Sequence, residues 1–237
     1  MPTTRESLEA ALAADPDNRT LHSAYADLLI EEGDPRGEYI RRELTDPDTV
    51  FSERMERTRL ERDWLGPLKH FLPNYPPKWR PHRDREYMKV DDSAPVNGVA
   101  IHWVLGWIDV AVIARNYSTI AGAIGEHPLG RLLREVCLVN LDDREPLTGD
   151  QFTNIVVSFE DRPVREWRMF GFVSLGDEIV ERLAVRSGLG RLESLGLSRC
   201  GITDYGACLL ASSQWIRTIR SLQIDDNHLS PIGIAAL

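Results

Sequence analysis

The feature that most constrains the fold of this chain is a repeat of 27 residues near its C-terminal end. Residues 192–210 (LESLGLSRCGITDYGACLL) and residues 219–237 (IRSLQIDDNHLSPIGIAAL) align without a gap. Apolar residues fall at the same places in both segments, and Cys200 takes the place of Asn227. Self-similarity at a period of this size is typical of stacked supersecondary units. The sequence therefore predicts a stack in which each unit contributes one strand and one helix.

The shared pattern, L-x-x-L-x-L-x-x-N/C-x-L, resembles that of leucine-rich repeats. Its L-x-L core predicts a short strand with two side chains directed into the core. The Asn or Cys that follows is expected to bond to backbone groups that the turn leaves unpaired. A helix then returns the chain, so that the next strand lies parallel to the first. The repeats resemble the ribonuclease-inhibitor type, with a full helix in each unit.

Earlier units are expected upstream of this pair, with a register that weakens toward the N-terminus. Their strands are predicted around Val110 and Val112, around Val136 and Leu138, and over Trp167, Phe170 and Phe172. The residues that re-enter the core would be Tyr117, Leu147, Leu175, Ile202 and Leu229. The expected fold class is α/β: an N-terminal all-α helical domain, then a right-handed leucine-rich-repeat solenoid with a curved parallel sheet.

The N-terminal third shows helical patterning and helix caps. Thr3 and Glu6 predict a capping box, and apolar residues recur at helical spacing from Leu21 to Leu29. The stretch EEGDPRGE then ends one helix at Gly33 and starts another at Asp34 and Pro35. The core of this unit is expected to contain Tyr25, Leu28, Leu29, Ile40 and Leu44.

Prolines concentrate in residues 72–98 and forbid regular structure through most of that segment. The expected organisation is a helical domain over 1–72, a Pro-rich linker over 73–98 and the repeat solenoid over 99–237. The linker also carries basic residues around Trp79 and His82. These could grip a phosphate or a base, but the acidic background favours side chains that clamp the linker onto its neighbours.

The first 45 residues resemble the repeat-companion domain, a short bacterial domain of undefined function that commonly precedes leucine-rich repeats. The motifs that carry this resemblance are Asp15-Pro16, Tyr25-Ala26-Asp27, the run from Glu31 to Glu38, and Ile40-Arg41. The chain departs from the family at Leu28, where members often carry Trp. The resemblance implies a bacterial protein and supplies no catalytic residues.

In the predicted solenoid, the partner-binding surface is expected on the sheet face away from the helices. The register assigns to it Ser194, Gly196, Ser198 and Arg199 in one unit, and Ser221, Gln223, Asp225 and Asp226 in the next. An earlier unit would add Glu135, Cys137, Val139 and Asn140. This composition predicts a protein-interaction module or scaffold with a protein partner. A solvated sheet face without a partner is the alternative.

Helix capping leaves Asp27, Arg36 and Glu38 of the companion motif unexplained. An ion-pair network between two helices is the favoured interpretation, because no His, Cys or Ser nucleophile lies in the motif. The rival hypothesis is a regulatory or enzymatic companion domain built on these three residues and targeted by the repeats. Their burial and pairing should discriminate between the two hypotheses.

Composition narrows the remaining classes of function. The net charge of −9 argues against a nucleic-acid partner, because phosphate binding relies on clustered Lys and Arg. No apolar run is long enough to span a membrane, no signal peptide is evident, and the three cysteines are too scattered for a disulfide framework. The cytoplasm is the expected location.

Catalytic and cofactor motifs are not found in the sequence. The six histidines lack metal-binding spacing, and no phosphate-binding glycine loop is present. Asp225, Asp226 and His228 suggest a cation site only weakly, because repeat turns are commonly acidic. We therefore expect no enzyme activity, no catalytic residue, no cofactor and no metal.

The C-terminal segment IGIAAL is apolar and carries no charged cap. Ile224, Leu229, Ile234 and Leu237 are expected to lack cover on one side. Either the natural protein continues beyond residue 237, or another copy or a partner covers this end. Self-association through the uncapped repeat is therefore one of the alternatives, and a longer repeat array is the favoured one.

Overall fold

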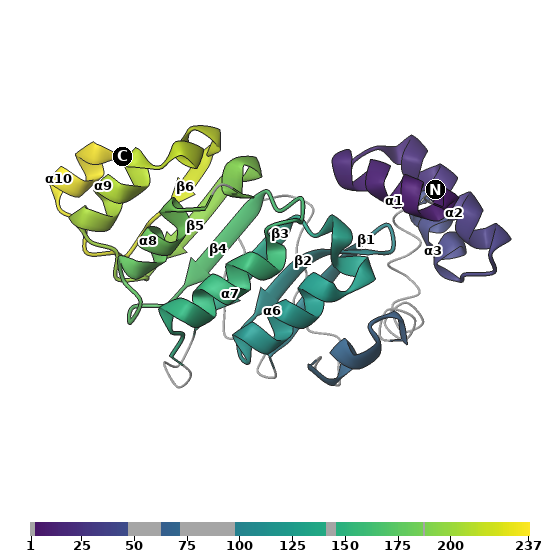
Figure 1. Cartoon of the computed structure of the whole chain (residues 1–237), viewed down its shortest axis with the longest axis horizontal. Coiled ribbons are helices and arrows are strands. Elements are labelled where there is room, and N and C mark those ends of the chain that lie inside the picture. Colours follow the sequence, from purple (N-terminus) through teal and green to yellow (C-terminus); the bar gives the residue numbers. More distant parts are fainter. Residues whose placement is uncertain (1–2, 47–62, 72–97, 141–145, 187) are drawn as a thin grey trace.

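The computed structural model describes residues 3–46, 63–71, 98–140, 146–186 and 188–237. These residues form a mixed α/β protein with a six-stranded sheet, whose strands follow one another in chain order. Figure 1 shows helices in a row along the sheet and the N-terminal helices at its β1 end. The α/β class expected from the sequence is confirmed. The predicted linker at 73–98, Gly98 excepted, and its basic and aromatic residues lie outside the described residues.

The bounds of the elements are as follows. The N-terminal unit contains α1 (Thr4–Ala14), α2 (Arg19–Glu31), α3 (Arg36–Thr45) and the 3-10 helix η1 (Gly66–Phe71). The sheet contains β1 (Val99–Val104), β2 (Trp107–Ile113), β3 (Glu135–Val139), β4 (Glu166–Phe170), β5 (Ser194–Ser198) and β6 (Ser221–Gln223). The helices beside the sheet are α6 (Tyr117–Glu126), α7 (Gly149–Phe159), α8 (Glu178–Ala184), α9 (Asp204–Ser212) and α10 (Pro231–Ala236). Short 3-10 helices η2 (Pro128–Leu132), η3 (Gly188–Arg191) and η4 (Gln214–Thr218) precede β3, β5 and β6.

Helix caps read from the sequence are present in the structure. Thr3 and Glu6 form the expected capping box at the start of α1. Gly33 adopts a positive φ of 74° after α2, a conformation that glycine adopts without strain. The Asp34 side chain accepts a hydrogen bond from the backbone N–H of Arg36 at 3.0 Å. Helix α3 begins at Arg36, one residue later than predicted, but the predicted cap residue Asp34 still accepts a hydrogen bond from the first N–H of the helix.

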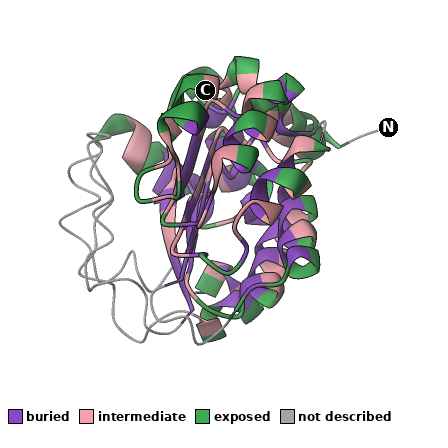
Figure 2. Ribbon diagram, turned by 90° about the vertical axis from the view of Figure 1, so that its left-hand side faces the viewer, coloured by how far each residue is buried: buried purple, intermediate pink, exposed green. Residues whose placement is uncertain are grey.

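The repeat register corresponds to a physical alignment of strands. β5 and β6 pair in parallel, with Ser194 opposite Ser221 and Leu195 opposite Leu222. Each neighbouring pair from β2 to β6 is parallel. Figure 2 shows buried residues along the sheet and on the sides of the helices that meet it. The side chains that the strands direct toward the helices therefore form one continuous core with them.

The turns after β5 and β6 are tied together as the register predicts. The Oδ1 atom of Asn227 accepts hydrogen bonds from the backbone N–H groups of Cys200 and Ile202, both at 3.0 Å. Its Nδ2 group donates to the carbonyl of Leu197 in the preceding unit. The Cys200 thiol, in the equivalent turn, donates to the carbonyl of Met169 one unit earlier. The expected equivalence of Cys200 and Asn227 is confirmed.

The predicted orientation of the first repeat strand is wrong. Val110 and Val112 were expected to point into the core, but they join Cys137 and Val139 in a separate apolar group. Ala111 and Ile113 point toward the helices instead. Almost every residue of β2 is buried, so alternation of polar and apolar residues gives no signal for its register. A slip of one residue then exchanges the two faces.

The strand predicted over Trp167, Phe170 and Phe172 is also partly wrong. β4 ends at Phe170, and its inward residues are Trp167 and Met169. Phe170 packs on the apolar group of the opposite face. Phe172 follows the strand and is fully buried among the core residues. The near-alternate spacing of these three aromatic residues suggested that they share one face of a strand. In the structure the strand ends at Phe170, before Phe172.

The sheet does not begin as a parallel sheet. β1 and β2 form an antiparallel hairpin, with an irregularity in the register between His102 and Trp103. The turn is made by Leu105 and Gly106, which both have positive φ. The expected parallel arrangement therefore holds only from β2 onward.

The N-terminal helices pack on this hairpin and share its core. The rings of Tyr25 and Trp107 stack with centroids 5.3 Å apart. A Cβ atom on Gly106 would lie 3.0 Å from the Ile40 side chain, so the turn closely approaches α3. Tyr25, Leu29 and Ile40 are fully buried, as predicted, and Leu44 packs against them. Leu28 is only half-buried.

Aspartates connect successive helices in a way that the sequence analysis missed. Asp177 accepts hydrogen bonds from the backbone N–H of Thr203 at 2.8 Å and from its hydroxyl group. In the following unit, Asp204 binds the backbone N–H and hydroxyl group of Ser230 in the same way. Gly206 leaves room for the first carboxylate, because a Cβ there would lie 2.2 Å from Asp177 Oδ1. We call these contacts the carboxylate brackets.

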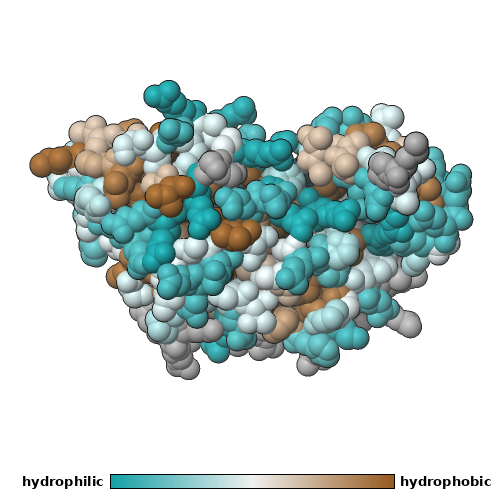
Figure 3. Space-filling model, in the orientation of Figure 1, coloured by the Kyte–Doolittle hydropathy of each residue, from teal (hydrophilic) through white to brown (hydrophobic). Residues whose placement is uncertain are grey.

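The C-terminal helix exposes apolar side chains, as expected. Ile232 is 73% exposed, Ile234 63% and Leu237 44%. Figure 3 shows hydrophobic residues at this end of the molecule. Ile224 and Leu229, which were also expected to lack cover on one side, are half-buried and pack against the core.

Within the described residues, no helix combines the length and the apolar character needed to cross a membrane.

Candidate functional site

The sheet face opposite the helices divides into an exposed half and a buried half. Over β5 and the turn that follows it, Ser194 and Ser198 are half-buried, Gly196 is buried and Arg199 is exposed. Over β6 and its turn, every residue assigned from the sequence is exposed, namely Ser221, Gln223, Asp225 and Asp226. We call these eight residues the polar strip.

Contacts within the polar strip fix part of its shape. The Ser198 hydroxyl group donates to Asp225 at 2.7 Å. The Arg199 guanidinium lies over the Phe170 ring, 5.5 Å from its centroid. Gly196 is covered by Arg168, whose Cγ would lie 3.3 Å from a Cβ at that position. The more open part of the strip is therefore the portion over β6.

The earlier unit does not extend the polar strip, which corrects the expectation. Cys137 is 2% exposed, Val139 1% and Asn140 6%. Cys137 and Val139 belong with Ala100, Val110 and Val112 to an apolar group on this half of the face. Burial raises the pKa of the Cys137 thiol to about 12, so this cysteine is not a ready nucleophile.

A charged group marks the border between the two halves. Arg168 pairs with Glu166 on its own strand and lies 3.6 Å from Glu135 on β3. Ser194 donates a hydrogen bond to the same Glu166 carboxylate at 3.2 Å. Glu135, expected as a face residue, is thus half-buried inside an ion-pair group.

The structure places Asp27, Arg36 and Glu38 in two separate groups instead of one network. Arg36 is buried and binds Asp34 through two of its nitrogen atoms, with the closer contact at 2.9 Å. Burial would raise the pKa of Asp34, but the hydrogen bonds from Arg36 outweigh it and hold that pKa below its usual value. Asp27 and Glu38 instead flank Arg41 on the surface, at 2.7 and 3.8 Å.

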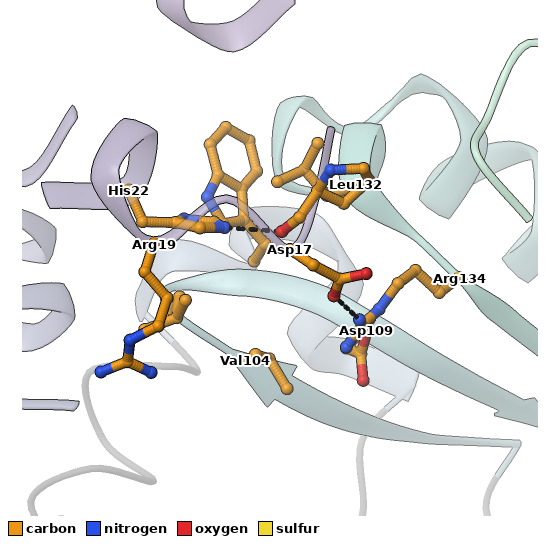
Figure 4. A pocket seen from close by; sticks show the side chains of 10 residues that line it. Asp17, Arg19, His22, Val104, Asp109, Leu132 and Arg134 are labelled. Carbon is orange, nitrogen blue, oxygen red and sulfur yellow. Dashed lines mark hydrogen bonds and ion pairs between the residues drawn. The ribbon is translucent and has the colours of Figure 1, made fainter. Parts of the chain in front are cut away.

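A pocket that the sequence analysis missed lies between the N-terminal helices and the sheet. Its volume is about 210 Å³. Arg19 and His22 line it from α2, Asp109 from β2 and Arg134 from the turn before β3 (Figure 4). Its other lining residues are Pro16, Asp17, Val104, Leu105, Trp107 and Leu132. No single sequence motif contains these positions, because the fold brings them together from distant segments. We call it the junction pocket.

Ion pairs connect the segments that line the junction pocket. Arg134 binds both Asp109 on β2 and Asp17 in the loop between α1 and α2. Asp17 also accepts a hydrogen bond from Arg165 at 3.3 Å. Asp17 therefore contacts the two arginines that directly precede β3 and β4, and ties the helical unit to them.

Two buried groups at the junction pocket have no hydrogen-bond partner among the described residues, namely the Nδ1 atom of His22 and the Nε1 atom of Trp107. Both residues are 2% exposed. The other ring nitrogen of His22 contacts the Pro16 carbonyl at 2.8 Å. Burial lowers the pKa of His22, which favours its neutral form.

Among the residues that the structure describes, no group of three or more His, Cys, Asp or Glu side chains is arranged to hold a metal ion.

Comparison with known proteins adds no relative to this description. The chain matches no protein-family model and no curated protein sequence. The class that the fold defines is that of mixed α/β proteins with mostly parallel strands, and function has to be argued from the surfaces above.

Proposed function

We propose that this chain is a leucine-rich-repeat protein with an N-terminal repeat-companion domain, and that it acts as a protein-interaction module. Support for the repeat assignment comes from the parallel strands, the 27-residue alignment of β5 with β6, and the Asn227 and Cys200 turns. Stacked units of this kind present one row of variable side chains per strand to a partner.

The observation that carries the proposal is the exposure of the polar strip over β6. Ser221, Gln223, Asp225 and Asp226 are open to solvent, while the corresponding half of the face over β2 and β3 is buried. Hydroxyl, amide and carboxylate groups at the edge of a sheet suit a partner that donates hydrogen bonds and carries cations. The net charge of −9 also favours a basic partner surface through long-range attraction.

The proposal assigns no catalytic residue, cofactor or metal to the chain. The alternative of a regulatory or enzymatic companion domain lacks a specific observation in its favour. Arg36 is occupied by Asp34, Asp27 and Glu38 flank Arg41, and none of the three lines the junction pocket. The free cysteines at 137, 200 and 208 accord with a reducing cytoplasm.

Photocrosslinking tests the proposed surface directly. A benzoylphenylalanine residue at Gln223 should crosslink a discrete protein in cells, whereas the same residue at Tyr205 should not. Tyr205 is a matched control because it is 57% exposed and lies on α9, away from the strip. Crosslinking of the same protein from both positions, or from neither, would contradict the proposal.

Charge removal then tests the partner's chemistry. With the crosslinked protein purified, Asp226→Asn should weaken binding by about fivefold to tenfold, while Asp161→Asn on the loop after α7 should not. The loss should shrink at high salt, because screening weakens contacts between exposed charges. Equal affinities for the two variants would show that the strip does not recognise a cation.

A further inference from the structure

The last helix of the stack lacks the cover that the helix before it has. α10 packs against α9, and β6 ends the sheet next to β5 (Figure 1). In α9, Ala207 and Leu210 are each 1% exposed. Ile234 and Leu237, which follow them by 27 residues in α10, are 63% and 44% exposed. Equivalent positions that are buried inside the stack are therefore open at its end.

The last strand shows the same loss of cover. Leu195 and Leu197 of β5 are fully buried, whereas Leu222 in β6 and Ile224 after it are only half-buried. Among the described residues, β6 pairs with β5 alone, so the far edge of β6 has no strand partner. A free strand edge beside exposed apolar side chains is suited to pairing with another strand.

One apolar side chain of α10 does not belong to this end of the stack. Ile232 is 73% exposed, but its equivalent Tyr205 is 57% exposed even though α10 packs against α9. The packing of a further unit therefore does not cover this position. We call the positions that do lose their cover the open end, namely Leu222, Ile224, Leu229, Ile234 and Leu237.

The two ends of β6 carry opposite charges. Arg220 directly precedes the strand, and its side chain is 80% exposed although it lies 3.4 Å from Glu193. Asp225 and Asp226 follow the strand and are exposed, and the Ser198 hydroxyl group occupies only Asp225. A parallel copy of this strand would place like charges together, whereas an antiparallel copy would place Arg220 near Asp226.

One antiparallel register matches both the apolar and the charged side chains. With Gln223 opposite Gln223 of a second copy, Leu222 lies opposite Ile224 and Arg220 lies opposite Asp226. Side chains that are opposite one another share a face of the sheet. A shift of one residue would place Leu222 opposite Gln223 and so bring the apolar side chains against polar ones.

We propose that the open end binds a second copy of this chain about a two-fold axis that passes beside Gln223. The two sheets join edge to edge through antiparallel β6 strands, and Ile234 and Leu237 of the two α10 helices cover one another. A symmetric contact of this kind closes at two copies. This inference is independent of the partner proposed for the polar strip, and its tests use the purified chain alone.

Sedimentation equilibrium of the purified chain measures the association. We expect an equilibrium between monomer and dimer with a Kd of about 10 µM. Ile234→Lys places a charge in the apolar contact and should weaken the dimer at least about tenfold. Ile232→Lys is the matched control on the same helix and should change the Kd by less than about twofold.

Charge reversal tests the direction of pairing. Arg220→Glu and Asp226→Arg each place like charges together in the antiparallel dimer and should each weaken it about tenfold at low salt. The double variant has the opposite charges in exchanged positions, so it should recover the affinity of the unmodified chain.

A cysteine beside the proposed axis tests the register. In a Cys208→Ser background, which removes the exposed native thiol, Gln223→Cys should form a disulfide between two copies on mild oxidation. Ser221→Cys is the control, because Ser221 is also an exposed residue of β6. In the proposed register the two copies of residue 221 lie roughly 13 Å apart, too far for a disulfide.

The proposal is overturned if the purified chain stays monomeric at about 1 mM. It is also overturned if Ile232→Lys weakens association as much as Ile234→Lys, or if the chain grows into open-ended assemblies, since a head-to-tail contact does not close. The antiparallel register is refuted if the charge-exchanged variant does not recover, or if Gln223→Cys forms no more disulfide than Ser221→Cys.

Discussion

Replacing Asn227 by Leu removes an amide that joins the turns after β5 and β6. Its Oδ1 atom accepts from Cys200 and Ile202, and its Nδ2 group donates to the carbonyls of Leu197 at 2.6 Å and Ile224 at 2.8 Å. At about 1 kcal/mol for each net hydrogen bond, four bonds would amount to about 4 kcal/mol. Asn227 is half-buried, so water replaces part of this, and we expect a loss of about 2–3 kcal/mol in the free energy of unfolding.

Urea unfolding followed by circular dichroism measures this loss as a lower midpoint. Hydrogen exchange provides a local readout, because the amide protons of Cys200 and Ile202 lose their acceptor in the variant and should exchange faster. Amides in α2, at the far end of the molecule, should change only through the global loss of stability.

Gln223→Leu is the matched control, since it also replaces an amide by Leu but at an exposed position on β6. It should change the free energy of unfolding by less than about 0.5 kcal/mol. The reasoning is refuted if Asn227→Leu is as stable as Gln223→Leu, or if the exchange of Cys200 and Ile202 is unaffected.

Three other changes test the core, the buried histidine and the carboxylate brackets by urea unfolding. Tyr25→Ala should cost about 3–5 kcal/mol, because its ring is fully buried, whereas Tyr25→Phe should cost only about 1 kcal/mol through the lost hydroxyl contact. The pKa of His22 is lowered in the folded protein, so the unfolded chain binds more protons below pH 6.5. The free energy of unfolding should therefore be highest above pH 6.5 and fall as the pH drops from 6.5 toward the folded pKa. His22→Gln should flatten this slope, and an unchanged slope would contradict a lowered pKa for His22. Gly206→Ala places a Cβ 2.2 Å from Asp177 Oδ1 and should lower the free energy of unfolding by about 1–3 kcal/mol. Gly190→Ala is the control, because a Cβ there has nothing within 4 Å, and it should be nearly neutral. Equal losses in the two variants would argue against the carboxylate bracket at Asp177.

The sequence predicted the later units well because their register has redundant signals. In β5, Leu195 and Leu197 alternate with small polar residues, and the Cys200 turn repeats at Asn227. β2 has no such alternation, since side chains on both of its faces are buried. The prediction chose Val110 and Val112, whereas Ala111 and Ile113 face the core.

Contacts between distant segments could not be predicted from patterns. The stack of Tyr25 on Trp107 and the junction pocket depend on how α2 meets the hairpin, for which no periodicity exists. The carboxylate brackets combine Asp, Thr or Ser, and Gly, residue types that turns use everywhere. The residues of the polar strip were predicted from the register, but the burial of Cys137 and Val139 was not, because the register says which face a side chain lies on and not whether that face is covered.

The carboxylate brackets give the stack a direction. Asp177 receives the N–H and hydroxyl groups of Thr203, and Asp204 receives those of Ser230. In each carboxylate bracket, donors on the later unit bind an acceptor on the earlier unit. The residue 27 positions after Asp204 is Pro231, which has neither a carboxylate nor an N–H group. A duplicated copy of the 27-residue segment should therefore insert between α8 and α9, where both partners exist, and not behind α10, where its first N–H groups would have no acceptor.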